Sequence, residues 1–139
     1  METRLEPSTA RVLVVDDFEP WRRAIRSTLK EHPILQIVGE AANGAEALQR
    51  AEELKPDLIL LDISLPILNG IEAARRMHEI VPEAKIVFVT SNVDKDVADA
   101  ALTNGAYGYI LKADGKSELL RAINAVLRGE KVVSKRLKR

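Results

Sequence analysis

The sequence has no cysteine, no long apolar run and no net charge, and each absence excludes a class of protein. Without cysteine the chain has no disulfide, thiol nucleophile or thiolate metal site, which fits a reducing cytoplasm. No stretch reaches the roughly eighteen apolar residues of a membrane-spanning helix, and residues 1–10 lack the apolar run of a signal peptide. Lys plus Arg and Asp plus Glu both number 21, so we expect no bulk attraction to nucleic acid or to an anionic membrane.

What the sequence does contain is an ordinary globular composition at the length of one domain. With 139 residues, 46% hydrophobic and 30% charged, the chain is long enough for one core and too short for two. We therefore expect a single cytoplasmic domain over residues 11–128, preceded by a flexible leader at residues 1–10. Residues 129–139, where the periodic pattern fades, are expected to be a solvated basic linker remnant rather than a phosphate-binding tail.

Short apolar runs alternate with segments of helical periodicity along the chain. Runs of strand length lie at residues 12–15, 35–38, 58–61, 86–89 and 109–111. Most of them are apolar without alternation, which is typical of strands covered on both faces. Turn residues such as Pro33, Pro56 and Gly105 separate the runs from the helical segments. The alternation predicts an α/β fold with a parallel sheet and right-handed crossovers.

Acidic, hydroxyl and amino side chains directly follow four of the predicted strands. These residues are Asp16 and Asp17, Asp62, Thr90 and Ser91, and Lys112. Because parallel strands end at the same edge of a sheet, we expect these side chains to meet there. Singly, each has an ordinary explanation: Asp62 as a turn or capping residue, Lys112 as a solvent-facing side chain. Their coincidence at four strand ends favours a shared site.

The residue types of this edge predict a particular chemistry. Three carboxylates in one crevice repel one another, and a bound divalent cation removes that conflict. Oxygen ligands, with neither cysteine nor a nearby histidine, favour Mg²⁺, which keeps waters that a phosphate can displace. Aspartate can act as the nucleophile of phosphoryl transfer, and Asp62 lies at the end of the most apolar strand. Lys112 and the Thr90 hydroxyl would then stabilise the charge of the transferred group.

At these residues the sequence resembles the receiver domain of bacterial two-component response regulators. The matching segments are residues 14–17, 60–70, 89–91 and 105–112, and the likeness extends from about residue 11 to residue 127. The resemblance implies a flavodoxin-like (βα)5 fold, a doubly wound parallel sheet with strand order 2-1-3-4-5. It also implies a phospho-acceptor signalling domain, which is not an enzyme beyond accepting a phosphoryl group from a donor and losing it slowly.

The resemblance assigns a role to each matching acidic residue. Asp62 would accept the phosphoryl group from a sensor histidine kinase and also bind Mg²⁺. The other metal ligands would be the carboxylates of Asp16 and Asp17 and the backbone carbonyl of Ser64.

It likewise assigns the groups that contact the phosphoryl oxygens and operate the switch. Lys112 and Ser91 would contact these oxygens, the Thr90 hydroxyl would turn toward them, and Tyr109 would change rotamer with it. Many relatives have a cis-linked proline directly after the lysine, whereas this chain has Ala113. Because a cis bond before a non-proline residue costs about 2.5–4 kcal/mol, we expect a trans link.

The end of the sequence is similar to receivers that precede a LuxR-type helix-turn-helix domain. This similarity covers residues 120–134, and no output domain follows. We expect an excised receiver rather than a natural single-domain regulator, with DNA bound only through the absent domain. Phosphorylation is expected to reshape the face of the fourth helix, fifth strand and fifth helix, and so to control homodimerisation or a transcriptional output.

Two rival functions fit the sequence less well. A phosphatase of the haloacid dehalogenase type would have a second aspartate two residues after its nucleophile, where this chain has Ser64. In a flavodoxin-like carrier, Asp16 and Asp17 would repel the phosphate of the flavin. A histidine kinase is excluded because no Gly-rich ATP-binding motif is present.

The single tryptophan leaves two interpretations open. Trp21 follows Asp17 by four residues, so it is either a core contact on a helix face, which we favour, or a reporter of ligand binding. His32 and His78 fall on helical segments away from the strand ends, and we expect no role for them.

Overall fold

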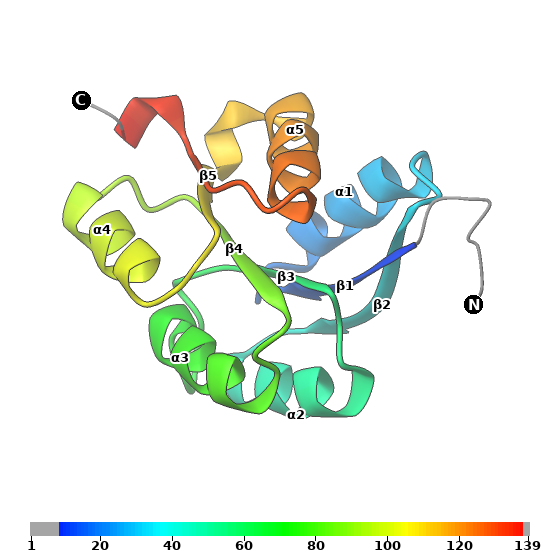
Figure 1. Ribbon diagram of the computed structural model, residues 1–139, viewed down its shortest axis with the longest axis horizontal. Helices are drawn as coiled ribbons and strands as arrows, with labels where there is room; N and C mark the ends of the chain where they lie inside the picture. Colours follow the sequence, from blue (N-terminus) through cyan, green and yellow to red (C-terminus); the bar gives the residue numbers. More distant parts are fainter. Residues whose placement is uncertain (1–8, 138–139) are drawn as a thin grey trace.

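The apolar runs lie side by side in one parallel sheet in the computed structural model, which describes residues 9–137 (Figure 1). The strands are β1 (Ala10–Val15), β2 (Leu35–Ala41), β3 (Leu58–Leu61), β4 (Lys85–Thr90), β5 (Gly108–Leu111) and β6 (Val132–Val133). Their order in the sheet is β2-β1-β3-β4-β5-β6. The α/β class, the parallel pairing and the order of the first five strands confirm the prediction.

The predicted sheet of five strands was incomplete, because β6 extends it by a sixth. The backbone N–H of Val132 donates to the carbonyl of Tyr107 at 2.9 Å, and that of Ser134 donates to Tyr109 at 2.9 Å. Ser134 and Leu137 are both buried, so residues 132–137 pack on the domain instead of lying free as the solvated linker that we expected. A strand of two residues is too short to show a periodic pattern in the sequence. What favours β6 is the edge of β5, whose backbone groups would otherwise be unpaired.

Helices cover both faces of the sheet. They are α1 (Glu19–Lys30), α2 (Gly44–Leu54), α3 (Gly70–Ile80), α4 (Lys95–Thr103) and α5 (Lys116–Leu127), with short 3₁₀ turns η1 (Lys112–Asp114) and η2 (Lys135–Leu137). In Figure 1, α1 and α5 lie on one side of the sheet and α2 and α3 on the other. No helix of residues 9–137 is long and apolar enough to cross a membrane.

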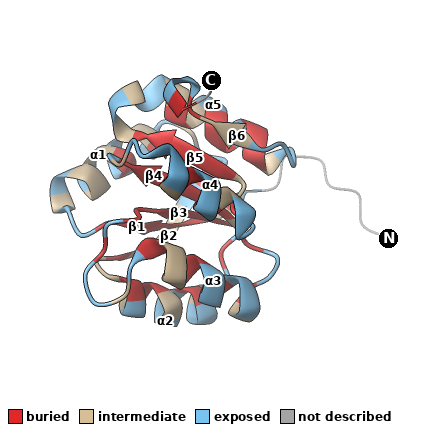
Figure 2. Ribbon diagram, turned by 90° about the vertical axis from the view of Figure 1, so that its left-hand side faces the viewer, coloured by how far each residue is buried: buried red, intermediate tan, exposed pale blue. Residues whose placement is uncertain are grey.

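The hydrophobic core consists of two clusters, one on each face of the sheet. Leu13 and Val15 of β1 pack with residues of α2, α3 and α4, whereas Val12 and Val14 pack with residues of α1 and α5. Figure 2 shows the central strands buried between the helical layers. Side chains of both orientations are therefore buried, which explains why these strands lack polar alternation.

Two features fix the start of α3 next to the end of β3. The side chain of Asn69 accepts a hydrogen bond from the backbone N–H of Glu72 at 3.0 Å and so caps the helix. A Cβ atom on Gly70 would lie only 2.1 Å from the carbonyl oxygen of Asp62. Glycine at position 70 therefore lets the helix approach the strand end that carries Asp62.

The expected leader is almost entirely outside the part of the chain that the structure describes. Residues 1–8 are not described, and neither are the last two residues of the basic end. Ala10 already belongs to β1, so the sheet begins slightly earlier than the apolar run indicated.

Candidate functional site

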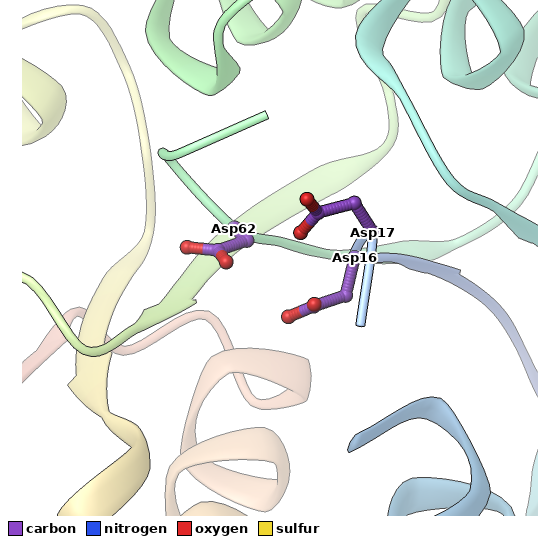
Figure 3. A group of neighbouring side chains, drawn as sticks. All are labelled: Asp16, Asp17 and Asp62. Atoms are coloured by element: carbon purple, nitrogen blue, oxygen red, sulfur yellow. The ribbon is translucent and has the colours of Figure 1, made fainter. Parts of the chain in front are cut away.

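Three carboxylates meet at the carboxyl edge of the sheet, as Figure 3 shows. Asp16 and Asp17 follow β1, and Asp62 follows β3. These strands are neighbours in register, with Val15 paired to Leu61, so their ends must come together. One oxygen from each of the three side chains lies within 4.8 Å of the others.

The carboxylates differ in their exposure to solvent. Asp16 is 1% exposed and Asp62 is 6% exposed, whereas Asp17 faces solvent. Burial raises the pKa of Asp16 above its usual value, and the nearby charge of Asp62 acts in the same direction. The Lys112 ammonium and the backbone N–H of Phe18, which donates to Asp16 Oδ1 at 2.9 Å, oppose that rise in the pKa.

Lys112 supplies the positive charge of the cluster. It follows β5 directly, and its Nζ lies 2.6 Å from Asp16 Oδ2 and 3.4 Å from Asp62 Oδ2. Its side chain is only 16% exposed, so these ion pairs are weakly screened. The peptide bond to Ala113 is trans, since residues 9–137 contain no cis bond.

The buried edge of this cluster fits a hard divalent cation. Asp16 Oδ2 is buried and forms an ion pair with Lys112 Nζ at 2.6 Å, but within residues 9–137 it accepts no hydrogen bond. An ion pair without a well-formed hydrogen bond compensates such a buried carboxylate oxygen only in part for its lost hydration. One oxygen each of Asp16, Asp62 and solvent-facing Asp17 form an all-oxygen donor set of the kind that Mg²⁺ prefers.

Thr90 and Tyr109 are both buried, and both form a hydrogen bond with the backbone of Asn92. The backbone N–H of Asn92 donates to Thr90 Oγ1 at 3.3 Å, and the Tyr109 hydroxyl donates to the Asn92 carbonyl at 2.9 Å. Tyr109 is fully buried; this burial, followed by the charges of Asp62 and Asp94, raises its pKa to about 12. The two residues predicted to act as a switch are thus joined through one residue of the β4–α4 loop.

The two predicted serines lie at the rim of the site. Both side chains are exposed. The backbone N–H of Ser64 points toward Asp62 and reaches its Oδ1 at 3.4 Å. Within residues 9–137, no hydrogen bond joins Ser91 to the carboxylates or to Lys112. An open groove of about 500 Å³ begins at Ile63, the residue after Asp62, and has Ser64 and Asn92 in its lining.

Two residues of α1 lie next to the cluster: Trp21, for which a core contact was favoured, and Arg22, for which the sequence predicted no role. The indole ring of Trp21 has its centroid 5.1 Å from Lys112 Nζ, and Arg22 Nη1 donates to the backbone carbonyl of Asp16 at 2.6 Å. Trp21 lies about one helical turn beyond Asp17, which was a usable signal. The contact with Arg22 had none, because it depends on the exact start of α1.

Comparisons with known proteins agree with this geometry. The family model of the response regulator receiver domain matches residues 12–124. The response regulator GacA of Pseudomonas viridiflava is 40% identical over 89% of this chain and 58% of its own length. The nitrate/nitrite response regulator NarL of Escherichia coli K12 is 39% identical over 95% of the chain and 60% of its own length. The chain thus spans about three fifths of these relatives.

A solved structure extends the likeness to three dimensions. A LuxR-family two-component response regulator from Aurantimonas superposes with a TM-score of 0.89 at 35% identity, covering 94% of this chain and 93% of that one. The resemblance to receivers of LuxR-type regulators is therefore confirmed. The family match over most of the chain, together with these identities, shows that the chain belongs to the response regulator receiver domain family.

Proposed function

We propose that this domain is a Mg²⁺-dependent phospho-acceptor switch of a two-component system, in which Asp62 is the acceptor. The observation that supports it best is the meeting of three carboxylates from two strand ends with the ammonium of Lys112. Such a cluster is unfavourable without a cation and suited to a phosphoryl group once a cation is present. The proposal also follows the regulatory role of the family and places the domain in the cytoplasm.

The metal would be held by side chains that already face one another. We assign Asp16, Asp17 and Asp62 as carboxylate ligands and the backbone carbonyl of Ser64 as a further ligand. Bound there, Mg²⁺ supplies positive charge that offsets the carboxylates and the incoming phosphoryl oxygens. The exposed side of Asp17 leaves an entry path for the hydrated ion.

Asp62 would receive the phosphoryl group from a phosphohistidine of a sensor kinase. A carboxylate oxygen of Asp62 attacks phosphorus, the P–O bond forms, and the P–N bond to the imidazole breaks. The imidazole nitrogen keeps the electron pair of that bond and takes a proton from solvent. Lys112 and Ser91 contact the phosphoryl oxygens, so Lys112 moves only from a carboxylate oxygen to a neighbouring phosphoryl oxygen.

The switch would begin with the exchange of one hydrogen-bond partner of Thr90. In this structure Thr90 Oγ1 accepts from Asn92, so turning toward a phosphoryl oxygen breaks that bond. The backbone carbonyl of Asn92 also accepts from the Tyr109 hydroxyl, so displacement of Asn92 would free the Tyr109 ring to change rotamer. Shifting the ratio of switched to unswitched molecules from 1:99 to 99:1 takes about 5.5 kcal/mol. Charge-assisted hydrogen bonds to the phosphoryl group contribute roughly 1.5–3 kcal/mol each, so two or three of them could supply much of this free energy.

The rotamer change of Tyr109 would alter the surface formed by α4, β5 and α5. The buried residues of α4 are Ala98 and Ala101, so little apolar surface holds that helix in place. We propose that this face controls homodimerisation or an output domain, and that DNA is bound only through such a domain. The names of GacA and NarL as response regulators support a regulatory output.

Intact mass spectrometry after incubation with acetyl phosphate tests the proposal. We expect a gain of one phosphoryl group that requires Mg²⁺, is abolished by EDTA and is absent in Asp62→Asn. The matched control is Asp99→Asn, because Asp99 is an exposed aspartate of α4 that pairs with Lys95 and lies outside the cluster. Phosphorylation of Asp62→Asn to the extent of the wild type would refute the assignment.

A further inference from the structure

We propose that Trp21 is a positioning residue for Lys112: its indole ring holds the ammonium beside Asp62, and its emission reports the position of that ammonium. The inference deepens the proposed function and rests on it. The contact joins α1 to the residue that follows β5, two segments far apart in the sequence.

The geometry is that of a cation–π contact. Lys112 Nζ lies 5.1 Å from the centroid of the Trp21 ring, inside the limit of about 6 Å for this interaction. Tryptophan is the most favourable aromatic partner for a cation. The ring is half-buried and packs against the core cluster of α1 and α5, so its face is fixed while Nζ approaches it.

The other contacts of Lys112 explain why such a support is useful. Nζ is anchored by Asp16 at 2.6 Å and by Asp62 at 3.4 Å, and both carboxylates are also proposed ligands of the metal. A metal ion bound to these carboxylates neutralises part of their charge and so weakens their attraction for the Lys112 ammonium. This happens when the ammonium has to be in place to contact the phosphoryl group. A lysine side chain has several rotatable bonds and is costly to keep in one rotamer. The indole ring is uncharged, so its hold on Nζ does not depend on those carboxylates.

The position of Trp21 gives a way to separate this role from simple core packing. The residue lies in the first turn of α1, directly beyond the loop that carries Asp16 and Asp17. Loosening of α1 would disturb these two carboxylates and weaken Mg²⁺ binding. Loss of the ring contact alone would disturb only Lys112, and hence the binding of a phosphoryl group.

The binding test compares the wild type with Trp21→Leu, which is apolar without a ring, and Trp21→Phe, which keeps one. Calorimetry measures the affinity for Mg²⁺ alone and then for beryllium fluoride, a phosphoryl mimic, in the presence of Mg²⁺. We expect Trp21→Leu to bind beryllium fluoride roughly three- to ten-fold more weakly, the range of a partly exposed cation–π contact. Trp21→Phe should recover part of this loss, and the Mg²⁺ affinity of all three proteins should be equal.

A fluorescence test examines the contact without any ligand. Trp21 is the only tryptophan, so the emission of the protein reports its ring alone. We expect Lys112→Met to change the emission of the unliganded protein, and Lys112→Arg, which keeps a cation over the ring, to restore it partly. In the wild type, beryllium fluoride with Mg²⁺ should change the emission again.

The outcomes distinguish the inference from the proposed function. If the wild type neither binds beryllium fluoride nor accepts a phosphoryl group, the proposed function fails, and the unliganded emission of Lys112→Met still decides whether the ring senses the ammonium. If the wild type is phosphorylated but Trp21→Leu binds both ligands normally, only the inference fails. The inference would also fail if Trp21→Leu lost affinity for Mg²⁺ and for beryllium fluoride in parallel. It would fail too if Trp21→Leu and Trp21→Phe lost the same affinity for beryllium fluoride.

Discussion

At the scale of single residues, the site concentrates negative charge where little solvent can disperse it. Asp16 and Asp62 are almost fully buried, and Lys112 is the cation that contacts both. The ammonium offsets part of this charge, but Asp16 still has a raised pKa because burial outweighs the attraction. This uncompensated negative charge makes the cluster suited to a divalent cation.

The titration of Tyr109 gives a prediction at the same scale. Burial raises its pKa from 10.0 to about 12, so above pH 10 the unfolded chain loses a proton that the folded one retains. The contribution of Tyr109 to stability is therefore complete below pH 10 and is lost as the pH rises through about 12. Thermal unfolding measured across this window should show the fall, and Tyr109→Phe should reduce it.

A direct titration provides the control. The chain has two tyrosines, so Tyr107→Phe leaves Tyr109 as the only source of phenolate absorbance. In the folded variant this absorbance should appear near pH 12, and in urea near pH 10. Titration at the same pH in both states would show that the Tyr109 hydroxyl is not buried as the structure has it.

At the scale of elements, the site depends on how closely each helix approaches the strand before it. α3 begins where a Cβ on residue 70 would lie 2.1 Å from the Asp62 carbonyl and 2.7 Å from Ile63 Cα. Both neighbours are backbone atoms of the segment that carries Asp62, so neither can move aside without displacing that residue. Gly70 therefore links the packing of α3 to the position of Asp62.

The cost of filling that space can be measured. We expect Gly70→Ala to lower the free energy of unfolding by about 1–3 kcal/mol, as overpacking does, and to slow phosphorylation by acetyl phosphate. The matched control is Gly39→Ala, where the nearest atom is the mobile end of Leu54 and the expected change is about 1 kcal/mol or less. Urea denaturation compares the two variants. If Gly70→Ala and Gly39→Ala were equally stable, the close approach of α3 to the backbone of Asp62 would not require glycine at position 70.

At the scale of the whole molecule, β6 decides whether the sheet has a free edge on the side of β5. The strand covers the carbonyls of Tyr107 and Tyr109, and the segment after it buries Leu137 against the cluster on the α4 side. Ser134 also donates a hydrogen bond to Asp114 of η1. Residues 132–137 are thereby attached to β5, the strand that carries Tyr109, and to η1, which follows it.

Truncation tests the contribution of this segment. A chain ending at Glu130 loses the backbone hydrogen bonds to Tyr107 and Tyr109 and the pairing with β5. It also loses the burial of Leu137, worth roughly 1.5–3 kcal/mol for such a side chain. The recovered chain entropy offsets part of this, so we expect a net loss of about 1–2 kcal/mol in the free energy of unfolding. A chain ending at Leu137 is the control and should match the full sequence. If the shorter chain is as stable in chemical denaturation, β6 does not stabilise the domain.

The oligomeric state should respond to the acceptor site. We expect the domain to shift from monomer to dimer when beryllium fluoride and Mg²⁺ are added, because in the proposed switch the α4-β5-α5 face changes with Tyr109. Light scattering coupled to size-exclusion chromatography measures the mass. Asp62→Asn should remain monomeric under the same conditions, and its dimerisation to the same extent would separate assembly from the acceptor.

The sequence by itself determined the order of the elements and the chemistry at their ends. Apolar runs of strand length and the acids, hydroxyls and lysine that follow them are local features, and parallel pairing alone brings those ends to one edge. Only the tertiary structure decided the contacts within that edge: Lys112 on Asp16 and Trp21, the Asn92 peptide between Thr90 and Tyr109, and β6 on β5. These depend on rotamers, loop paths and an unpaired strand edge, which arise from packing between distant segments and leave no periodic pattern in the chain.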